Sequence, residues 1–149
     1  MGSPVVAFLT GVGRDGANRT LDDVLALDDA ALERHHDFIQ WMFPLSEPSR
    51  AVPGSPVLTE EDRLVISSSA IALANLAAGA ARMSDFYDRT TDWLESHDHN
   101  HLRISRIIRS LRLLIGDTAA DQFRDARLAD IAARNGRVNP LSLDHWQQS

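Results

Sequence analysis

The fold is decided by the stretch HNHLRISRIIRSLRLLI, residues 99–115. At the angle of about 100° per residue of an α-helix, its aliphatic side chains fall on one face. These are Ile104, Ile107, Ile108, Leu111, Leu114 and Ile115. Such a face has to be buried, and Gly116 is a typical helix end. The stretch therefore predicts an amphipathic core helix over residues 99–115.

The polar side of the same helix is lined by arginine at every third position. These residues are Arg103, Arg106, Arg109 and Arg112, and the helix contains no acidic residue. The preceding stretch, residues 84–98, is acidic instead. One interpretation is therefore acid–base pairing between neighbouring helices, which contributes about 0–1 kcal/mol for each exposed pair.

The second interpretation is a pocket for an anion or a carboxylate. Helical spacing puts His99, Arg103, Arg106 and Ser110 in one stripe beside the apolar face, while Asn100 points into that face. A buried asparagine needs hydrogen-bond partners. The planar guanidinium group of arginine can bind both oxygens of a carboxylate at once.

A second polar group is expected inside an apolar run, HDFIQWMFPL at residues 36–45. This run closes a predicted helix over residues 29–43, which Pro44 ends. Because the run is apolar all round, Gln40 should be buried and should need a partner, for which Asn100 or Arg103 is the candidate. We expect His36 to be half-buried.

The rest of the chain is predicted to be helical too. Helices are expected over residues 21–26, 60–89 and 118–134, with a short terminal one after Asn139 and Pro140. The first two are expected to begin with a capping pair, Thr20 with Asp23 and Thr59 with Asp62. A proline-rich connection, residues 44–58, follows the second helix. Only residues 5–9 suggest a strand. The prediction is all-α: one domain, residues 1–149, built as a compact bundle of five or six helices.

Composition excludes several kinds of chemistry. The chain has 149 residues, a net charge of −6 and no cysteine, and all 15 basic residues are arginine. Thiol chemistry, lysine Schiff bases and general nucleic-acid binding are therefore not expected. His97, His99 and His101 alternate, so in a helix their side chains point about 200° apart and cannot share a metal ion. No nucleophile elbow or nucleotide-binding glycine motif is present. We assign no catalytic residue, metal or cofactor.

No membrane span is expected. Residues 64–81 carry no charge, but they contain three consecutive serines and are otherwise rich in alanine. They fit a buried helix with small side chains better than a transmembrane segment. The first four residues, MGSP, do not resemble a secretory signal, so we expect a cytoplasmic protein.

Several blocks of the chain resemble the conserved region of the opioid growth factor receptor family. HDFIQWMFPL (36–45) is similar to that family's His-x-aromatic-Ile-Gln-Trp-Leu-Phe-Pro-Leu block, with Met42 in place of leucine. HNHLRISRII (99–108) is similar to its His-Asn-x-Leu-Arg-Ile-Thr-Arg-Ile-Leu block, with Ser105 in place of threonine. PVLT (56–59), TLDD (20–23) and Trp146 also fit, so the resemblance covers nearly the whole chain.

The resemblance implies a receptor-type domain that binds a small peptide and associates peripherally with membranes, as the animal proteins are said to do. The lysine-free composition is typical of a bacterium with a GC-rich genome. The family supplies no catalytic residue to carry over.

We therefore predict a domain that binds an anionic small molecule or a peptide. The predicted ligand-binding residues are His36, Gln40, Trp41, His99, Asn100, Arg103 and Arg106. An alternative is an enzyme that uses these residues, with His36 or His99 carrying a proton. A third is an interaction module whose polar residues only fix the core. Homo-oligomerisation stays open.

Overall fold

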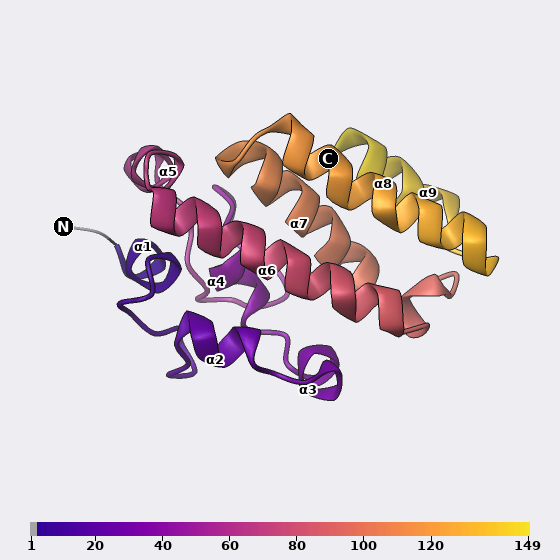
Figure 1. Cartoon of the computed structure of the whole chain (residues 1–149), viewed down its shortest axis with the longest axis horizontal. Coiled ribbons are helices and arrows are strands. Elements are labelled where there is room, and N and C mark those ends of the chain that lie inside the picture. Colours follow the sequence, from indigo (N-terminus) through magenta and orange to yellow (C-terminus); the bar gives the residue numbers. More distant parts are fainter. Residues whose placement is uncertain (1–2) are drawn as a thin grey trace. The chain divides into compact units, whose positions relative to one another are not determined.

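The computed structural model describes residues 3–149. Met1 and Gly2, which belong to the stretch predicted not to be a secretory signal, lie outside the described residues. Over the described residues 64% are helical, in nine α-helices and one 3₁₀ helix, η1, with no strand. This confirms the all-α prediction, and five of the helices have seven residues or more. The helices are α1 (Pro4–Leu9), α2 (Leu21–Leu25), α3 (Asp29–Arg34), α4 (Ile39–Met42), α5 (Glu60–Ser67), α6 (Ala70–Arg89), η1 (Asp92–Leu94), α7 (Asn100–Leu114), α8 (Asp117–Arg134) and α9 (Pro140–Gln148) (Figure 1).

Contacts within the chain divide it into two compact units, and the boundary between them in the sequence falls within α6. The first unit runs up to Gly79 and the second covers residues 80–149. The prediction of one domain stays a prediction.

The first unit begins with a helix where the sequence suggested a strand. Pro4 occupies the first turn of α1, and the Ser3 side chain accepts a hydrogen bond from the Val6 N–H. Val5, Val6, Phe8 and Leu9 are buried. Their spacing suits one face of a short helix at least as well as a strand, and the cap decides between the two.

The helix predicted over residues 29–43 is two helices. The chain leaves α3 at His35, which has extended backbone angles, and enters the four-residue α4 at Ile39. Between them, Asp37 accepts a hydrogen bond from the Arg19 guanidinium at 2.7 Å. This contact from a distant loop holds the connection in place. As predicted, α4 ends just before Pro44, so the proline-rich connection follows the fourth helix.

The helix predicted over residues 60–89 is also broken. Thr59 and Asp62 form the expected capping box of α5. Ser69 Oγ then accepts a hydrogen bond from the Ala72 N–H and starts α6, whose axis is bent by 91° from that of α5. Within residues 3–149 no single helix has the length and apolar character to cross a membrane; only α5 and α6 taken together, as a bent pair, meet that test.

The second unit is built on α7, as the sequence predicts. Ile104, Ile107 and Ile108 are completely buried, and Leu111 and Leu114 nearly so. Ile115 was predicted on the same face but is 38% exposed, because α7 ends at Leu114 and the chain turns at Gly116. The predicted boundaries of the last two helices are also met, since α8 ends at a left-handed Asn135 and α9 begins at Pro140 behind the cap residue Asn139.

A buried arginine organises the aromatic side chains of this unit. Arg127 on α8 is 1% exposed, and its guanidinium carbon lies 5.3–5.7 Å from the ring centres of Phe123, Tyr87 and Trp93. The same group pairs with Asp88 at 2.8 Å and with Asp130 at 3.0 Å. The two carboxylates and the faces of the three rings together offset the free-energy cost of removing the guanidinium group from water.

Replacing Arg127 with alanine should therefore destabilise the protein. Removing one partner of a buried ion pair costs about 3–5 kcal/mol, and we expect the lower end because Asp88 is half exposed. Urea unfolding followed by circular dichroism measures the change. Arg137→Ala, which removes an exposed pair with Glu95, is the control and should cost about 0–1 kcal/mol. Equal losses in the two variants would contradict the role assigned to Arg127.

Candidate functional site

Three of the predicted ligand-binding residues lie in the first unit, on or just before α4. Gln40 is buried, as predicted, with 5% of its surface exposed. Trp41 is half-buried and packs edge-on against Phe8, with ring centres 5.8 Å apart. His36 was expected to be half-buried but is exposed, because it lies in the connection between α3 and α4 rather than inside a helix.

The Gln40 amide is the unusual group of this set. Its Oε1 atom is buried and has no hydrogen-bond partner among residues 3–149. Buried side-chain polar atoms are paired in the large majority of cases. This carbonyl oxygen can only accept, so it has to be matched by an N–H or O–H group.

The segment before α4 is anchored by a chain of charges. The Asp15 carboxylate is fully buried and accepts hydrogen bonds from the Arg19 side chain at 2.7 Å and from the backbone N–H groups of Ala17 and Arg19. Arg19 in turn donates to Asp37 at 2.7 Å. Burial is the largest single influence on Asp37 and acts to raise its pKa. The hydrogen bond and the charge of Arg19, together with a backbone hydrogen bond, outweigh burial, so the pKa of Asp37 lies below its ordinary value.

The other predicted residues lie in the second unit, at the start of α7. Asn100 is 1% exposed and points into the core face, as predicted. Its Oδ1 accepts from the Tyr87 hydroxyl at 3.1 Å and from Arg103 at 3.5 Å, while its Nδ2 donates to Asp98 at 2.9 Å. Asn100 is thus largely satisfied inside the protein. Whether these residues and those of α4 serve one ligand stays a prediction.

The exposure of the neighbouring side chains differs from residue to residue. Arg103 is 6% exposed, Arg106 is half-buried, and the His99 side chain is 41% exposed. Within this unit Arg112 pairs with Asp117 and Asp121 of α8 at 2.9 and 2.8 Å, rather than with the acidic stretch of residues 84–98. His99 and Arg106 are therefore the more accessible of the predicted residues that lie on or next to α7.

Sequence reasoning did not single out His101 as a site residue. Its ring is 5% exposed, with Nε2 lying 2.8 Å from the Trp93 carbonyl oxygen and Nδ1 lying 3.1 Å from Ser142 Oγ. Trp146 packs edge-on against the ring and donates to the His101 carbonyl at 3.0 Å. A signal was present, since His101 and Ile108 are about two helical turns apart and share a face.

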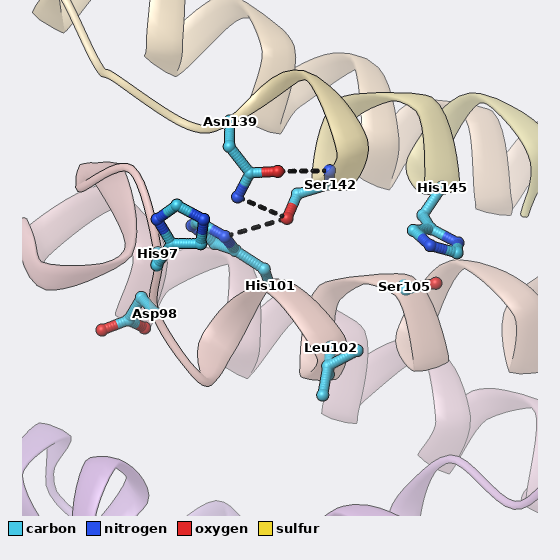
Figure 2. A pocket seen from close by; sticks show the side chains of 8 residues that line it. All are labelled: His97, Asp98, His101, Leu102, Ser105, Asn139, Ser142 and His145. Atoms are coloured by element: carbon cyan, nitrogen blue, oxygen red, sulfur yellow. Dashed lines mark hydrogen bonds between the residues drawn. The ribbon is translucent and has the colours of Figure 1, made fainter.

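His101 also lines a partly open pocket of about 200 Å³ between the start of α7 and α9 (Figure 2). Ser142, Asn139 and Ser105 contribute polar atoms to its wall, and the exposed rings of His97 and His145 flank it. Polar side chains from both helices thus reach one small space.

Comparison with known proteins gives one consistent name. The chain is 36% identical to opioid growth factor receptor of Mus musculus, with 54% of this chain and 15% of that protein aligned. It is 34% identical to the Rattus norvegicus protein, with 54% of this chain and 17% of that protein aligned. It is 30% identical to the Homo sapiens protein, with 62% of this chain and 16% of that protein aligned. The chain carries a distant opioid growth factor receptor-like region. It spans only 15–17% of the length of these curated relatives.

No family model and no solved structure matches this chain. The family resemblance predicted from the sequence is confirmed at the level of a distant opioid growth factor receptor-like region. Of the two longest blocks on which we based it, residues 36–45 include α4, and residues 99–108 comprise the N-cap His99 and the start of α7.

The hydrogen bond between Asn100 and Tyr87 can be tested with a double-mutant cycle. Asn100→Ala removes an acceptor from the buried Tyr87 hydroxyl, which should cost about 1–3 kcal/mol in the free energy of unfolding. In a Tyr87→Phe background the same change should cost less, with a coupling of at least about 0.5 kcal/mol. If the losses of unfolding free energy in the two single variants add up to the loss in the double variant, the hydrogen bond between Asn100 and Tyr87 is contradicted.

The pKa of Asp37 predicts a dependence of stability on pH. Its folded pKa lies below the ordinary value of 3.8, so its contribution is present at neutral pH and is lost as the pH falls through the folded pKa. Asp37→Asn should therefore reduce the difference in unfolding free energy between pH 6 and pH 3, measured by urea titration. An unchanged difference would show that the pair with Arg19 is not formed.

Proposed function

We propose that this chain is an opioid growth factor receptor-like module whose predicted ligand-binding residues bind, without catalysing a reaction, a short peptide or a similar anionic molecule bearing N–H donors. The observation that carries the proposal is the buried Oε1 atom of Gln40, which has no hydrogen-bond partner among residues 3–149. The name of the relatives, which are receptors, agrees with it.

The chemistry of Gln40 suggests the kind of ligand. Leaving a buried acceptor unpaired costs about 1–3 kcal/mol. Because this atom is buried, the side chains that cover it have to move before a ligand can donate to it. The donated hydrogen bond then removes this cost and adds to the affinity. Backbone N–H groups of a peptide are such donors. The half-buried Trp41 indole beside Gln40 offers an apolar wall, and the exposed His36 offers a further polar group.

For the arginines of α7, in the second unit, we propose separately that they bind an anionic group. A peptide carries a terminal carboxylate, and a guanidinium group binds both of its oxygens in one plane. Arg106 is half-buried and Arg103 nearly fully buried, so both are partly desolvated, which strengthens an ionic hydrogen bond. Their involvement is tested separately from that of Gln40.

As part of the same proposal the module works in the cytoplasm. The alternative, implied by the family resemblance, is peripheral association with a membrane.

A Gln40→Met variant gives the sharpest test. The change keeps the volume and removes the unpaired oxygen, so the unliganded protein should be unchanged or stabilised by about 0–1 kcal/mol. Thermal-shift measurements with a panel of short peptides, phosphate and citrate should give a rise in Tm for the wild type, because a ligand that binds only the folded state stabilises it. A rise produced by a peptide should be lost in Gln40→Met, and a rise produced by phosphate or citrate should be weakened in Arg106→Ala.

Gln147→Met, at an exposed position of α9, is the matched control and should keep the full rise in Tm. The proposal fails if no probe shifts the wild type. It also fails if Gln40→Met binds like the wild type, or if that variant is destabilised by several degrees in the absence of any probe, since Gln40 would then be a satisfied structural group.

A further inference from the structure

The pocket between α7 and α9 contains a serine bonded to a histidine, and neither residue belongs to the proposed ligand-binding set. Ser142 Oγ lies 3.1 Å from His101 Nδ1, as the dashed line in Figure 2 shows. Ser142 is half-buried, and the pocket in front of it, about 200 Å³, is partly open. A small molecule can therefore reach the hydroxyl group.

The hydrogen bonds of His101 fix which ring nitrogen carries the proton. A backbone carbonyl oxygen can only accept, so Nε2, at 2.8 Å from the Trp93 carbonyl, must be the protonated nitrogen. Nδ1 of the neutral ring then has a free electron pair and can only accept. It follows that the Ser142 hydroxyl donates its hydrogen to Nδ1.

The serine is held in that position by the cap of α9. Asn139 Nδ2 donates to Ser142 Oγ at 3.0 Å, and the Ser142 backbone N–H donates to Asn139 Oδ1 at 2.9 Å. Asn139 is itself fixed by a hydrogen bond to the Ser96 carbonyl at 2.6 Å. An oriented base within hydrogen-bond reach of a positioned hydroxyl is the arrangement that activates a serine nucleophile.

We propose that Ser142 and His101 form a nucleophile–base pair that hydrolyses small carboxylic esters. The pocket volume limits the acyl group to a few carbon atoms. This activity goes beyond the binding function proposed above and does not depend on it, because it uses other residues.

The reaction balances with water as the only co-reactant. As Ser142 Oγ bonds to the ester carbonyl carbon, its proton passes to His101 Nδ1 and the carbonyl oxygen becomes an oxyanion. The carbon–oxygen bond of the leaving alcohol then breaks, and the alcohol takes the proton from Nδ1. Water attacks the acyl-serine in the same way and releases the acid and free Ser142.

Two further groups on the pocket wall can assist. The rings of His97 and His145 are exposed and flank the pocket, so their N–H groups are donors for the oxyanion. His101, by contrast, contacts the nucleophile directly and is the base. The Trp93 carbonyl keeps the base in the required tautomer.

The test is labelling of the folded, full-length chain with a fluorophosphonate, followed by peptide mapping, together with hydrolysis of p-nitrophenyl acetate. We expect one label, on Ser142. Ser142→Ala should abolish the label and lower the rate of hydrolysis by about 10²-fold or more. Ser46→Ala is the control: Ser46 is an exposed serine of the first unit that does not line the pocket, and its loss should leave both readouts unchanged.

Mapping the label on the wild type keeps the test valid even if Ser142→Ala does not fold. A wild type that is folded by circular dichroism but takes no label overturns the proposal. A label spread over several serines, or hydrolysis that persists in a folded Ser142→Ala variant, overturns it as well.

Discussion

The imidazole of His101 is the contact on which the second unit depends. One ring nitrogen bonds to the Trp93 carbonyl in η1 and the other to Ser142 in α9, while the backbone carbonyl of His101 accepts from Trp146. These partners lie 8, 41 and 45 residues away along the chain. A single residue of α7 therefore ties η1 and α9 to this helix, and its two ring hydrogen bonds require that Nε2 carries a proton.

Other buried polar groups of this unit follow the same principle. Asn100 joins Tyr87 to Asp98, and the Arg127 guanidinium lies against three aromatic rings while pairing with Asp88 and Asp130. Each such group would be costly if left unpaired, so each one excludes packings in which its partners are absent. The Arg127 Nε and Asp130 Oδ2 atoms have no hydrogen-bond partner among the described residues, but both side chains belong to ion pairs. The buried Gln40 Oε1 of the first unit differs, because among residues 3–149 it has neither a hydrogen-bond partner nor an ion pair. Because of that difference, we assign a structural role to Asn100 and a ligand-binding role to Gln40.

The sequence predicted what local rules control. The apolar face of α7, the capping boxes at Thr20 and Thr59 and the start of α9 at Pro140 follow from spacing and cap chemistry. The breaks at His35 and at Ser68–Ser69 were missed: the first coincides with the long-range contact between Arg19 and Asp37, and the second with a serine cap inside an otherwise helical pattern. At the candidate site, the burial of Gln40 and Asn100 could be predicted from the apolar residues that surround them in the sequence. The pairing of His101 with Ser142 was not, because helical periodicity says nothing about contacts across 41 residues.

The most direct test of this account is the tautomer of His101, measured at pH 7.5 by long-range ¹H–¹⁵N NMR of the uniformly labelled protein, with His101→Gln used for assignment. We predict the Nε2–H tautomer, with Nδ1 unprotonated and accepting from Ser142. An Nδ1–H tautomer, or a ring that is protonated on both nitrogens at this pH, would contradict the account, since either state removes the acceptor to which Ser142 is bonded.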